Sequence, residues 1–124
     1  MVYHLASLTP LEKNKKKLNQ VNYQGTKNLF DAIKNKTKSI VYISGLTVFD
    51  SKYTEIDENT PKNPDTYFTK LRVMAQLYLK EKCQENAINF ATSYVGDVVY
   101  GNGGFFKHEI VNRIKKNTFR IPGD

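Results

Sequence analysis

The side chains best suited to metal, redox or nucleic-acid chemistry are few in this sequence and are poorly spaced for it. Cys83 is the single cysteine, so it cannot form an internal disulfide and cannot by itself build a zinc site. The two histidines, His4 and His108, lack the spacing of metal ligands. The basic run Lys13–Lys17 lies beside Glu12 without the interleaved aromatic residues that stack on bases. We expect no metal site, and we interpret the basic run as a solvated loop or helix start.

Length and composition limit the class of protein. The 124 residues are 40% hydrophobic and 25% charged, which fits one small globular domain or a piece of a larger one. No apolar run approaches the ~20 residues that cross a bilayer, and the N-terminus lacks the pattern of a secretory signal. The formal charge of +7 comes mostly from scattered lysines among many asparagines, which indicates a compositional bias. We therefore expect a soluble, cytoplasmic protein that binds neither membranes nor nucleic acid.

The first part of the chain has the pattern of a strand, a helix and a second strand. Val2–Ala6 is short and apolar and predicts a buried strand, which Pro10 prevents from continuing. From about residue 17 to residue 35 the apolar positions recur at helical spacing, with Gly25 as the one weak point. Ser39–Ile43 is a continuous β-branched and aromatic run, which is typical of a parallel strand covered on both faces.

The rest of the chain repeats this alternation. Residues 44–65 predict a loop with a short extended piece at Thr47–Phe49, and loops of this length in compact domains are usually functional. We expect a second helix from about Thr66 to Asn86 and a third strand at Ile88–Val95. Beyond Gly101, Gly103 and Gly104, the pattern predicts a third helix carrying Phe106, Ile110, Val111 and Ile114, then a brief extended segment from Thr118 to Ile121.

The alternation of strands and helices predicts the fold class and the place of a ligand. It indicates an α/β fold with a parallel sheet of three main strands joined by right-handed crossover helices. In such sheets ligands bind beyond the carboxyl ends of the strands. Those ends are Ala6–Ser7, Ser44–Gly45 and Gly96–Asp97, which we expect to form one rim.

Five short segments, in order along the chain, carry a recognisable set of motifs. They are Tyr3–Ser7, Val21–Leu29, Tyr42–Phe49, Ile56–Pro61 and Gly96–Gly101. In the same order they resemble the fourth strand and its turn, the V-N-x-x-G-T-x-N-L helix, the fifth strand and serine loop, the acidic I-D-E-x-T-P segment, and the V-Y-G segment of one family. That family is the extended short-chain dehydrogenases/reductases, also called NAD-dependent epimerase/dehydratases. The resemblance implies a partial Rossmann-like, NAD(P)-binding domain over residues 1–124.

The resemblance also implies a chemistry. In this family hydride moves to or from NAD or NADP, and a tyrosine handles the proton. A lysine one helical turn away lowers the phenol pKa from about 10 and holds the cofactor ribose, while a serine or threonine hydroxyl orients the reacting carbonyl. The implied substrate is a small molecule such as a sugar nucleotide, a steroid or a related ketone or alcohol. The cofactor carries the difficult step and the protein positions it.

The catalytic helix can be aligned with the family motif Y-x-x-x-K in two ways. Without a gap, Phe68 stands at the tyrosine and Arg72 at the lysine, and phenylalanine has no proton to transfer. With one residue deleted, Tyr67 and Lys70 are the surviving pair, still neighbours on a helix with about 5–6 Å between Cβ atoms. We favour the gapless alignment, because an insertion in a helix rotates every later apolar residue off its face.

The remaining site residues follow from the same resemblance. Ser44 is the candidate hydroxyl, but counting back from Val48 puts Gly45 at its place, and adjacent residues in extended backbone point opposite ways. An ordinary strand-end hydroxyl is therefore the alternative interpretation of Ser44. The resemblance implies cofactor contacts for Leu5, Ala6, Ser7 and Asn22, and a packing role for His4. For Asn22 the alternative is a helix polar group bonded to neighbouring backbone.

Two regions depart from the family pattern. No glycine-rich, pyrophosphate-binding turn precedes the first strand, and the cluster Gly101–Gly104 matches a later substrate-side loop. The sequence stops at Asp124, where the family pattern continues, and Tyr94 stands where the family often has an arginine. We expect an internal, truncated or degenerate portion of such a domain, with doubtful activity and no measurable binding of NAD(P) by this chain alone.

Other functions remain open at this point. The first is a non-catalytic binding or scaffold module that associates through the sheet edge left open by the missing strands, because an unpaired apolar edge promotes association. The second, a basic nucleic-acid module, depends on charge alone. We also expect self-association or partial unfolding, since three strands with their helices lack neighbours.

Overall fold

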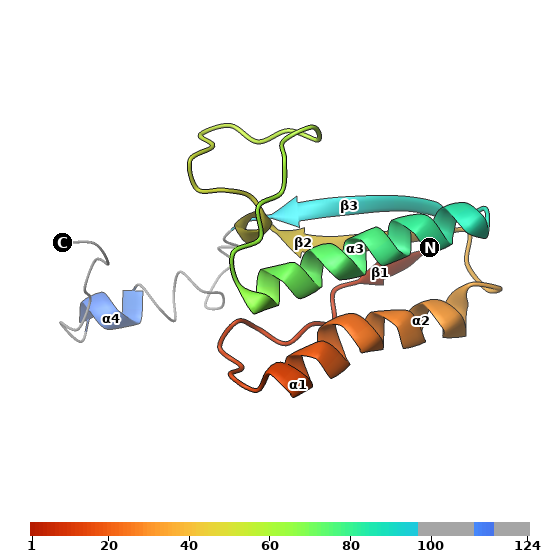
Figure 1. Cartoon of the computed structure of the whole chain (residues 1–124), viewed down its shortest axis with the longest axis horizontal. Helices are drawn as coiled ribbons and strands as arrows, with labels where there is room; N and C mark the ends of the chain where they lie inside the picture. The colour runs from red at the N-terminus through yellow and green to blue at the C-terminus, as the bar shows by residue number, and fades with distance from the viewer. Residues whose placement is uncertain (97–110, 116–124) are drawn as a thin grey trace. The chain divides into compact units, whose positions relative to one another are not determined.

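The computed structural model describes residues 1–96 and 111–115 (Figure 1). The chain divides into two units, Met1–Tyr94 and Val95–Asp124. The second unit contains one described helix, α4 (Asn112–Lys115), which overlaps the third predicted helix. The rest of that helix and the extended segment predicted at Thr118–Ile121 lie outside the described residues. The site and its supporting elements belong to the first unit.

A parallel sheet forms the base of the first unit. Its strands are β1 (Val2–His4), β2 (Ser39–Gly45) and β3 (Asn89–Val95), in the order β1-β2-β3. β1 and β2 are parallel, with Val2 opposite Ile40 and His4 opposite Tyr42. β3 runs in the same direction on the other side of β2 (Figure 1). The predicted α/β class is confirmed.

The first crossover is a single helical rod in three stretches. They are α1 (Lys15–Asn19), the π-helical turn η1 (Gln20–Gln24) and α2 (Gly25–Ile33). Asn14 caps the rod by accepting the backbone N–H of Lys17 at 3.1 Å. Gly25 does not interrupt it, because the residue stays in the right-handed helical region. The helix predicted over residues 17–35 is confirmed.

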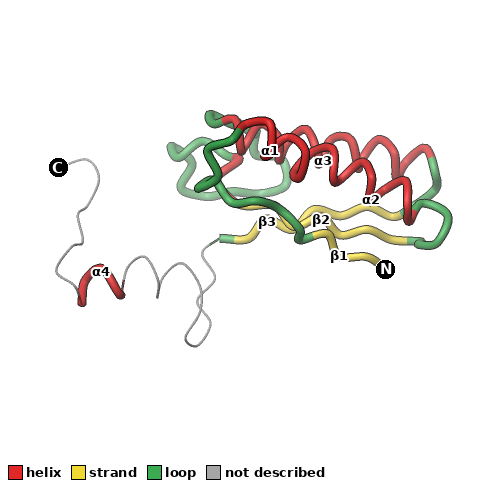
Figure 2. The backbone as a smooth tube through the Cα atoms, turned by 90° about the horizontal axis from the view of Figure 1, so that it is seen from below, coloured by secondary structure: helices red, strands yellow, loops and turns green. Residues whose placement is uncertain are grey.

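The second crossover is the long helix α3 (Tyr67–Glu85). Thr66 begins it with a capping box, since its hydroxyl accepts the Thr69 N–H and the Thr69 hydroxyl accepts the Thr66 N–H, each at 3.1 Å. The predicted span from Thr66 to Asn86 agrees with this helix and its two caps. α1, α2 and α3 cover one face of the sheet (Figure 2), as expected when successive crossovers of the same hand step the same way across it. None of the helices in the described part of the chain has the length and hydrophobicity to cross a membrane.

The hydrophobic core lies between this helical layer and the sheet. Its buried members come from α2, α3, β2 and the turn before β3, and they are Phe30, Ile40, Tyr42, Ala75, Leu79, Cys83 and Ile88. Cys83 is fully buried, and burial raises the pKa of its thiol. The lone cysteine is therefore a packing residue.

Burial along β2 alternates, which corrects one expectation. Ile40, Tyr42 and Ser44 are buried toward the helices, whereas Val41 and Ile43 on the other face remain half-exposed. Tyr3 lies opposite Val41 in β1 and is 62% exposed. The expectation that both faces are covered is thus wrong for the described residues, because a uniform apolar run does not indicate which face is packed.

The loop between β2 and α3 contains a second correction. The extended piece expected at Thr47–Phe49 begins instead as a 3-10 turn, η2 (Leu46–Val48), closed by a bond from the Phe49 N–H to the Leu46 carbonyl. Phe49 then forms an isolated antiparallel bridge with Lys62. β-Branched residues favoured a strand locally, but the turn buries Val48 and Phe49 against the domain.

Candidate active site

The candidate site lies at the carboxyl ends of β1 and β2. Parallel pairing brings the segment after His4 and the end of β2 to the same edge of the sheet, as expected from the rim prediction. Gly96 directly follows β3, and Asp97 lies outside the described residues. A pocket of about 390 Å³ opens in this region between the loop after β1, the loop after β2 and the start of α3. Its lining residues are Pro10, Thr47, Phe49, Asp50, Ser51, Asn63, Asp65, Thr66, Phe68 and Thr69.

Arg72 connects α3 to the end of β2. Its guanidinium donates a hydrogen bond to the Ile43 carbonyl and lies over two aromatic rings, 5.3 Å from the Tyr42 centroid and 5.8 Å from the Phe68 centroid. The residue is only 9% exposed. Phe68 and Arg72 are one helical turn apart, so the gapless pair faces the sheet together.

Tyr67 and Lys70 lie on a different side of α3. Tyr67 is 38% exposed, and the Lys15 ammonium of α1 lies 5.7 Å from its ring centroid. Lys70 is exposed to solvent. The structure therefore leaves this pair at the surface, whereas Ser44 is buried beneath the helices.

Ser44 and Gly45 lie on opposite faces of the sheet, because successive positions of β2 alternate. Ser44 is 2% exposed, and its hydroxyl oxygen has no hydrogen-bond partner among the described residues. Gly45 is half-buried on the other face, with extended backbone. The hydroxyl thus lies on the side of the sheet that carries Ile40 and Tyr42.

Asn22 holds the chain segment that follows β1. Its side-chain oxygen accepts the Leu8 N–H at 2.7 Å, and its side-chain nitrogen donates to the Leu8 carbonyl at 3.1 Å. In the same segment Leu5 and Ala6 are exposed, and the Ser7 hydroxyl donates to the Leu8 carbonyl. The four predicted cofactor contacts are therefore brought together, with the amide of Asn22 engaged on backbone.

A buried polar chain continues from Asn22 to the sheet. The Thr26 hydroxyl donates to the Asn22 carbonyl at 3.0 Å and lies 2.8 Å from Nε2 of His4. Because this hydroxyl has a single proton, the imidazole Nε2 is the donor in the second bond. Burial, and then the charge of Arg72, lower the pKa of His4 and so favour its neutral imidazole.

The pocket adds acidic and amide groups that sequence reasoning left in an undifferentiated loop. Asp50 accepts the Lys52 N–H at 3.0 Å and an Asn63 side-chain N–H at 3.1 Å, and these bonds lower the pKa of its carboxyl. The length of the loop was the available signal, but which of its residues face the pocket depends on the turn η2 and on the bridge from Phe49 to Lys62. Among residues 1–96 and 111–115, no cluster of metal-ligating side chains occurs.

A comparison with protein families matches almost the whole chain. The model of the 3-beta hydroxysteroid dehydrogenase/isomerase family matches residues 1–122. This chain belongs to that family. The family is of the NAD-dependent epimerase/dehydratase type, so the resemblance predicted from five short motifs is confirmed. No curated protein matches the chain.

Solved structures share the fold of this 3-beta hydroxysteroid dehydrogenase/isomerase family member at low sequence identity. UDP-glucuronic acid 4-epimerase from Bacillus cereus, in complex with NAD, is 18% identical with a TM-score of 0.80, over 94% of this chain and 39% of the epimerase. RMD from Pseudomonas aeruginosa, complexed with NADPH, is 19% identical with a TM-score of 0.77, over 95% of this chain and 45% of that protein. UDP-N-acetylglucosamine 4-epimerase from Methanobrevibacter ruminantium M1 is 23% identical with a TM-score of 0.66, over 80% and 33%. The chain thus spans less than half the length of each of these proteins.

Proposed function

We propose that this family member is a degenerate NAD(P)-dependent epimerase, dehydratase or reductase that does not transfer protons through a tyrosine–lysine pair and is inactive alone. The burial and contacts of Arg72 support the proposal. Its guanidinium is buried between two aromatic rings and bound to the Ile43 carbonyl, at the point of α3 where the family motif has lysine.

Proton transfer in this family needs two groups, a phenol and an adjacent cation. A phenol has a pKa near 10, so it acts near neutral pH only when an adjacent cation stabilises the phenolate. Phe68 has no ionisable proton. The Arg72 guanidinium already contacts aromatic rings and donates a hydrogen bond to a backbone carbonyl. Tyr67 and Lys70 have the right chemical types, but both are exposed while the candidate hydroxyl of Ser44 is buried.

The cofactor class of the family is NAD or NADP, and the described residues fit it poorly. Leu5, Ala6 and Ser7 are exposed or half-exposed residues that follow β1. The two groups that would hold a ribose or nicotinamide are committed elsewhere, because Asn22 binds the Leu8 backbone and Arg72 binds the Ile43 carbonyl. We therefore derive no chemical step through a cofactor in this chain.

The proposed substrate is a small molecule with a hydroxyl or ketone group, such as a steroid or a sugar nucleotide. Two features of the pocket support a mixed apolar and polar ligand. Pro10, Phe49 and Phe68 provide apolar walls, and Asp50 and Asp65 provide carboxylates that accept hydrogen bonds from hydroxyl groups.

The test is a cofactor titration combined with a turnover assay on the full chain. Calorimetry with NAD(H) and NADP(H) is expected to give no saturable heat. Incubation of a 3-beta hydroxysteroid with NAD is expected to give no NADH absorbance, and incubation of a UDP-sugar with NAD to give no epimer on product analysis. Micromolar binding would contradict the cofactor part of the proposal. Turnover that Tyr67→Phe or Lys70→Gln abolishes, and that the loop control Tyr53→Phe retains, would contradict its catalytic part.

A second candidate function is a non-catalytic scaffold module that associates through the edge of β1. It is favoured by the 62% and 64% exposure of Tyr3 and Leu5 beside an outer strand of the three-stranded sheet. If it holds, replacing both residues with lysine should reduce association with a partner without changing the fold. Unchanged association in that variant would exclude the edge of β1 as the interface.

A further inference from the structure

The loop between β2 and α3 differs in charge from the rest of the chain. Residues 46–66 contain five acids and two lysines, so this loop has a formal charge of −3 in a chain of +7. The same loop provides most of the residues that line the pocket. Walls of one charge raise the local concentration of ligands of the opposite charge. The sign of the loop therefore favours a cationic ligand.

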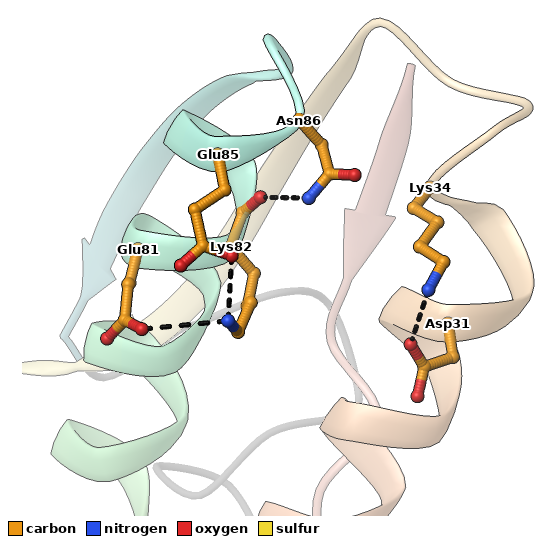
Figure 3. Close-up of polar contacts among 6 residues, drawn as sticks. All are labelled: Asp31, Lys34, Glu81, Lys82, Glu85 and Asn86. Carbon is orange, nitrogen blue, oxygen red and sulfur yellow. Dashed lines mark hydrogen bonds and ion pairs between the residues drawn. The ribbon is translucent and has the colours of Figure 1, made fainter.

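The acids on the described helices are matched by neighbouring lysines, in contrast to this loop. At the end of α2 the Asp31 carboxylate lies 3.0 Å from the Lys34 ammonium, and on α3 the Lys82 ammonium lies 2.7 Å from the Glu85 carboxylate (Figure 3). Asp65, which lines the pocket, makes no ion pair within the described residues. Its charge is thus left for a ligand.

The described residues that line the pocket include two carboxylates and no lysine or arginine. Two cations close to the pocket in sequence are held by other groups. The Arg72 guanidinium donates to the Ile43 carbonyl. The Lys62 ammonium lies over two aromatic rings, 5.7 Å from the Phe49 centroid and 5.4 Å from the Tyr94 centroid. Neither cation is paired with a carboxylate of the pocket.

Asp50 is a fixed anion in the pocket wall. Its Oδ1 accepts the Lys52 N–H at 3.0 Å and its Oδ2 accepts a side-chain N–H of Asn63 at 3.1 Å, and these bonds lower the pKa of the carboxyl. The Lys52 ammonium lies 3.5 Å from Oδ2, but this lysine side chain is 67% exposed. An exposed ion pair of this length is weak, so a ligand ammonium can take the place of Lys52.

Two hydroxyl groups of the pocket are free to bind a ligand hydroxyl. The hydroxyls of Thr66 and Thr69 lie 2.9 Å apart and bond to each other in the capping box. The hydroxyls of Thr47 and Ser51 also line the pocket, and they make no hydrogen bond to another described residue. A volume of about 390 Å³ accommodates a ligand built on a single ring.

We propose that this pocket binds a small hydroxylated amine in its cationic form and discriminates against phosphate-bearing ligands. Asp50 and Asp65 bind the ammonium group, and Thr47 and Ser51 bind the hydroxyl. The inference rests on the proposed function, because it names the substrate class of the same pocket. It disfavours a sugar nucleotide, since the diphosphate would enter a site whose fixed charges have the same sign.

Three ring compounds of similar size test the charge preference. trans-4-Aminocyclohexanol is a cation near neutral pH, cyclohexane-1,4-diol is neutral, and 4-hydroxycyclohexanecarboxylate is an anion. Each is titrated into the full chain at low salt, and the NMR signals of the phenylalanine rings are followed. The amine should bind about tenfold more tightly than the diol, because it gains two partly exposed ion pairs, and the carboxylate should not saturate. Equal affinities for the amine and the diol, saturation by the carboxylate, or no binding of the amine would overturn the proposal.

Neutral variants locate the charge that causes the preference. Asp50→Asn and Asp65→Asn should each weaken binding of the amine about threefold and leave binding of the diol unchanged. Glu55→Gln is the matched control, because it removes an exposed acid of the same loop that does not line the pocket. Circular dichroism checks that each variant is folded. A control that weakens amine binding as much as Asp65→Asn would assign the effect to overall charge and overturn the proposal.

The experiment contains no cofactor, so its failure differs from failure of the proposed function. UDP-glucose should not displace the bound amine, and displacement would contradict the inferred discrimination. Preference for the amine together with saturable binding of NADH would contradict the proposed function and support this inference. Absence of both amine and NADH binding would contradict this inference alone.

Discussion

Replacing Arg72 with methionine tests whether this residue is a structural clamp. The substitution removes the hydrogen bond to the Ile43 carbonyl and the contacts with the Tyr42 and Phe68 rings, while it keeps most of the apolar stem. If Arg72 instead waits to bind an anion, its removal should leave the folded state unchanged or more stable. The two roles therefore predict different free energies of unfolding.

The expected loss can be worked from the contacts. A hydrogen bond from a charged donor contributes about 1.5–3 kcal/mol, and a partly desolvated cation–π contact about 0.5–2 kcal/mol. Removing a buried charge recovers part of its desolvation cost. The net destabilisation by Arg72→Met is then about 1–3 kcal/mol, since the residue is 9% exposed.

Urea denaturation followed by circular dichroism measures this loss. With a slope of about 1–3 kcal/mol/M, the transition midpoint should fall by about 1 M at unchanged slope. Arg72→Lys is the matched control, because it keeps the charge but loses the planar fork, and it should lose most of the same stability. An Arg72→Met variant at least as stable as the wild type would refute a stabilising role for Arg72.

The same variant has a second readout in His4. Burial lowers the pKa of His4 most, and the charge of Arg72 lowers it further. In Arg72→Met the pKa of His4 should therefore rise while remaining below its ordinary value. Proton NMR can follow this change because the chain has two histidines. An unchanged pKa of His4 would mean that the guanidinium lies elsewhere.

Three further predictions concern the supports of the site. Asn22→Ala should destabilise the fold by about 1–3 kcal/mol in urea denaturation, because it leaves the partly buried N–H and carbonyl of Leu8 unpaired; a neutral effect would mean that water replaces the amide. The pKa of His4 in the folded state lies below its unfolded value near 6.5, so the unfolded state binds more protons. The free energy of unfolding should therefore fall as the pH drops through about 6.5. This pH dependence should be weaker in His4→Gln. Thr66→Ala should cost about 1 kcal/mol through the lost cap on Thr69, and an unchanged melting temperature would argue against the capping box.

Sequence patterns predicted the elements well where local rules decide. The spacing of apolar residues in α3 predicted a helix from about Thr66 to Asn86, which agrees with the observed span. Alternation of strands and helices similarly predicted the parallel sheet. These features depend on neighbours in sequence, so a single chain contains the information.

Features that depend on tertiary contacts were beyond the sequence. The sequence placed Phe68 and Arg72 on the family motif, but it could not indicate that the guanidinium turns inward to the Ile43 carbonyl. It left two interpretations of Asn22, a cofactor contact and a bond to neighbouring backbone. The side chain instead bonds the backbone of Leu8, because the segment after β1 folds back over the helix. The roles of Tyr67, Lys70 and Ser44 in catalysis stay predictions.

In the function that we propose, Arg72 serves the fold and not a cofactor. Nitrogen-15 NMR of the Arg72 guanidinium in the full chain, with and without NADH, tests it most directly. We predict slowly exchanging, restricted side-chain N–H signals that NADH does not move. Signals that exchange as rapidly as those of a solvated arginine, or that shift saturably with NADH, would contradict the claim.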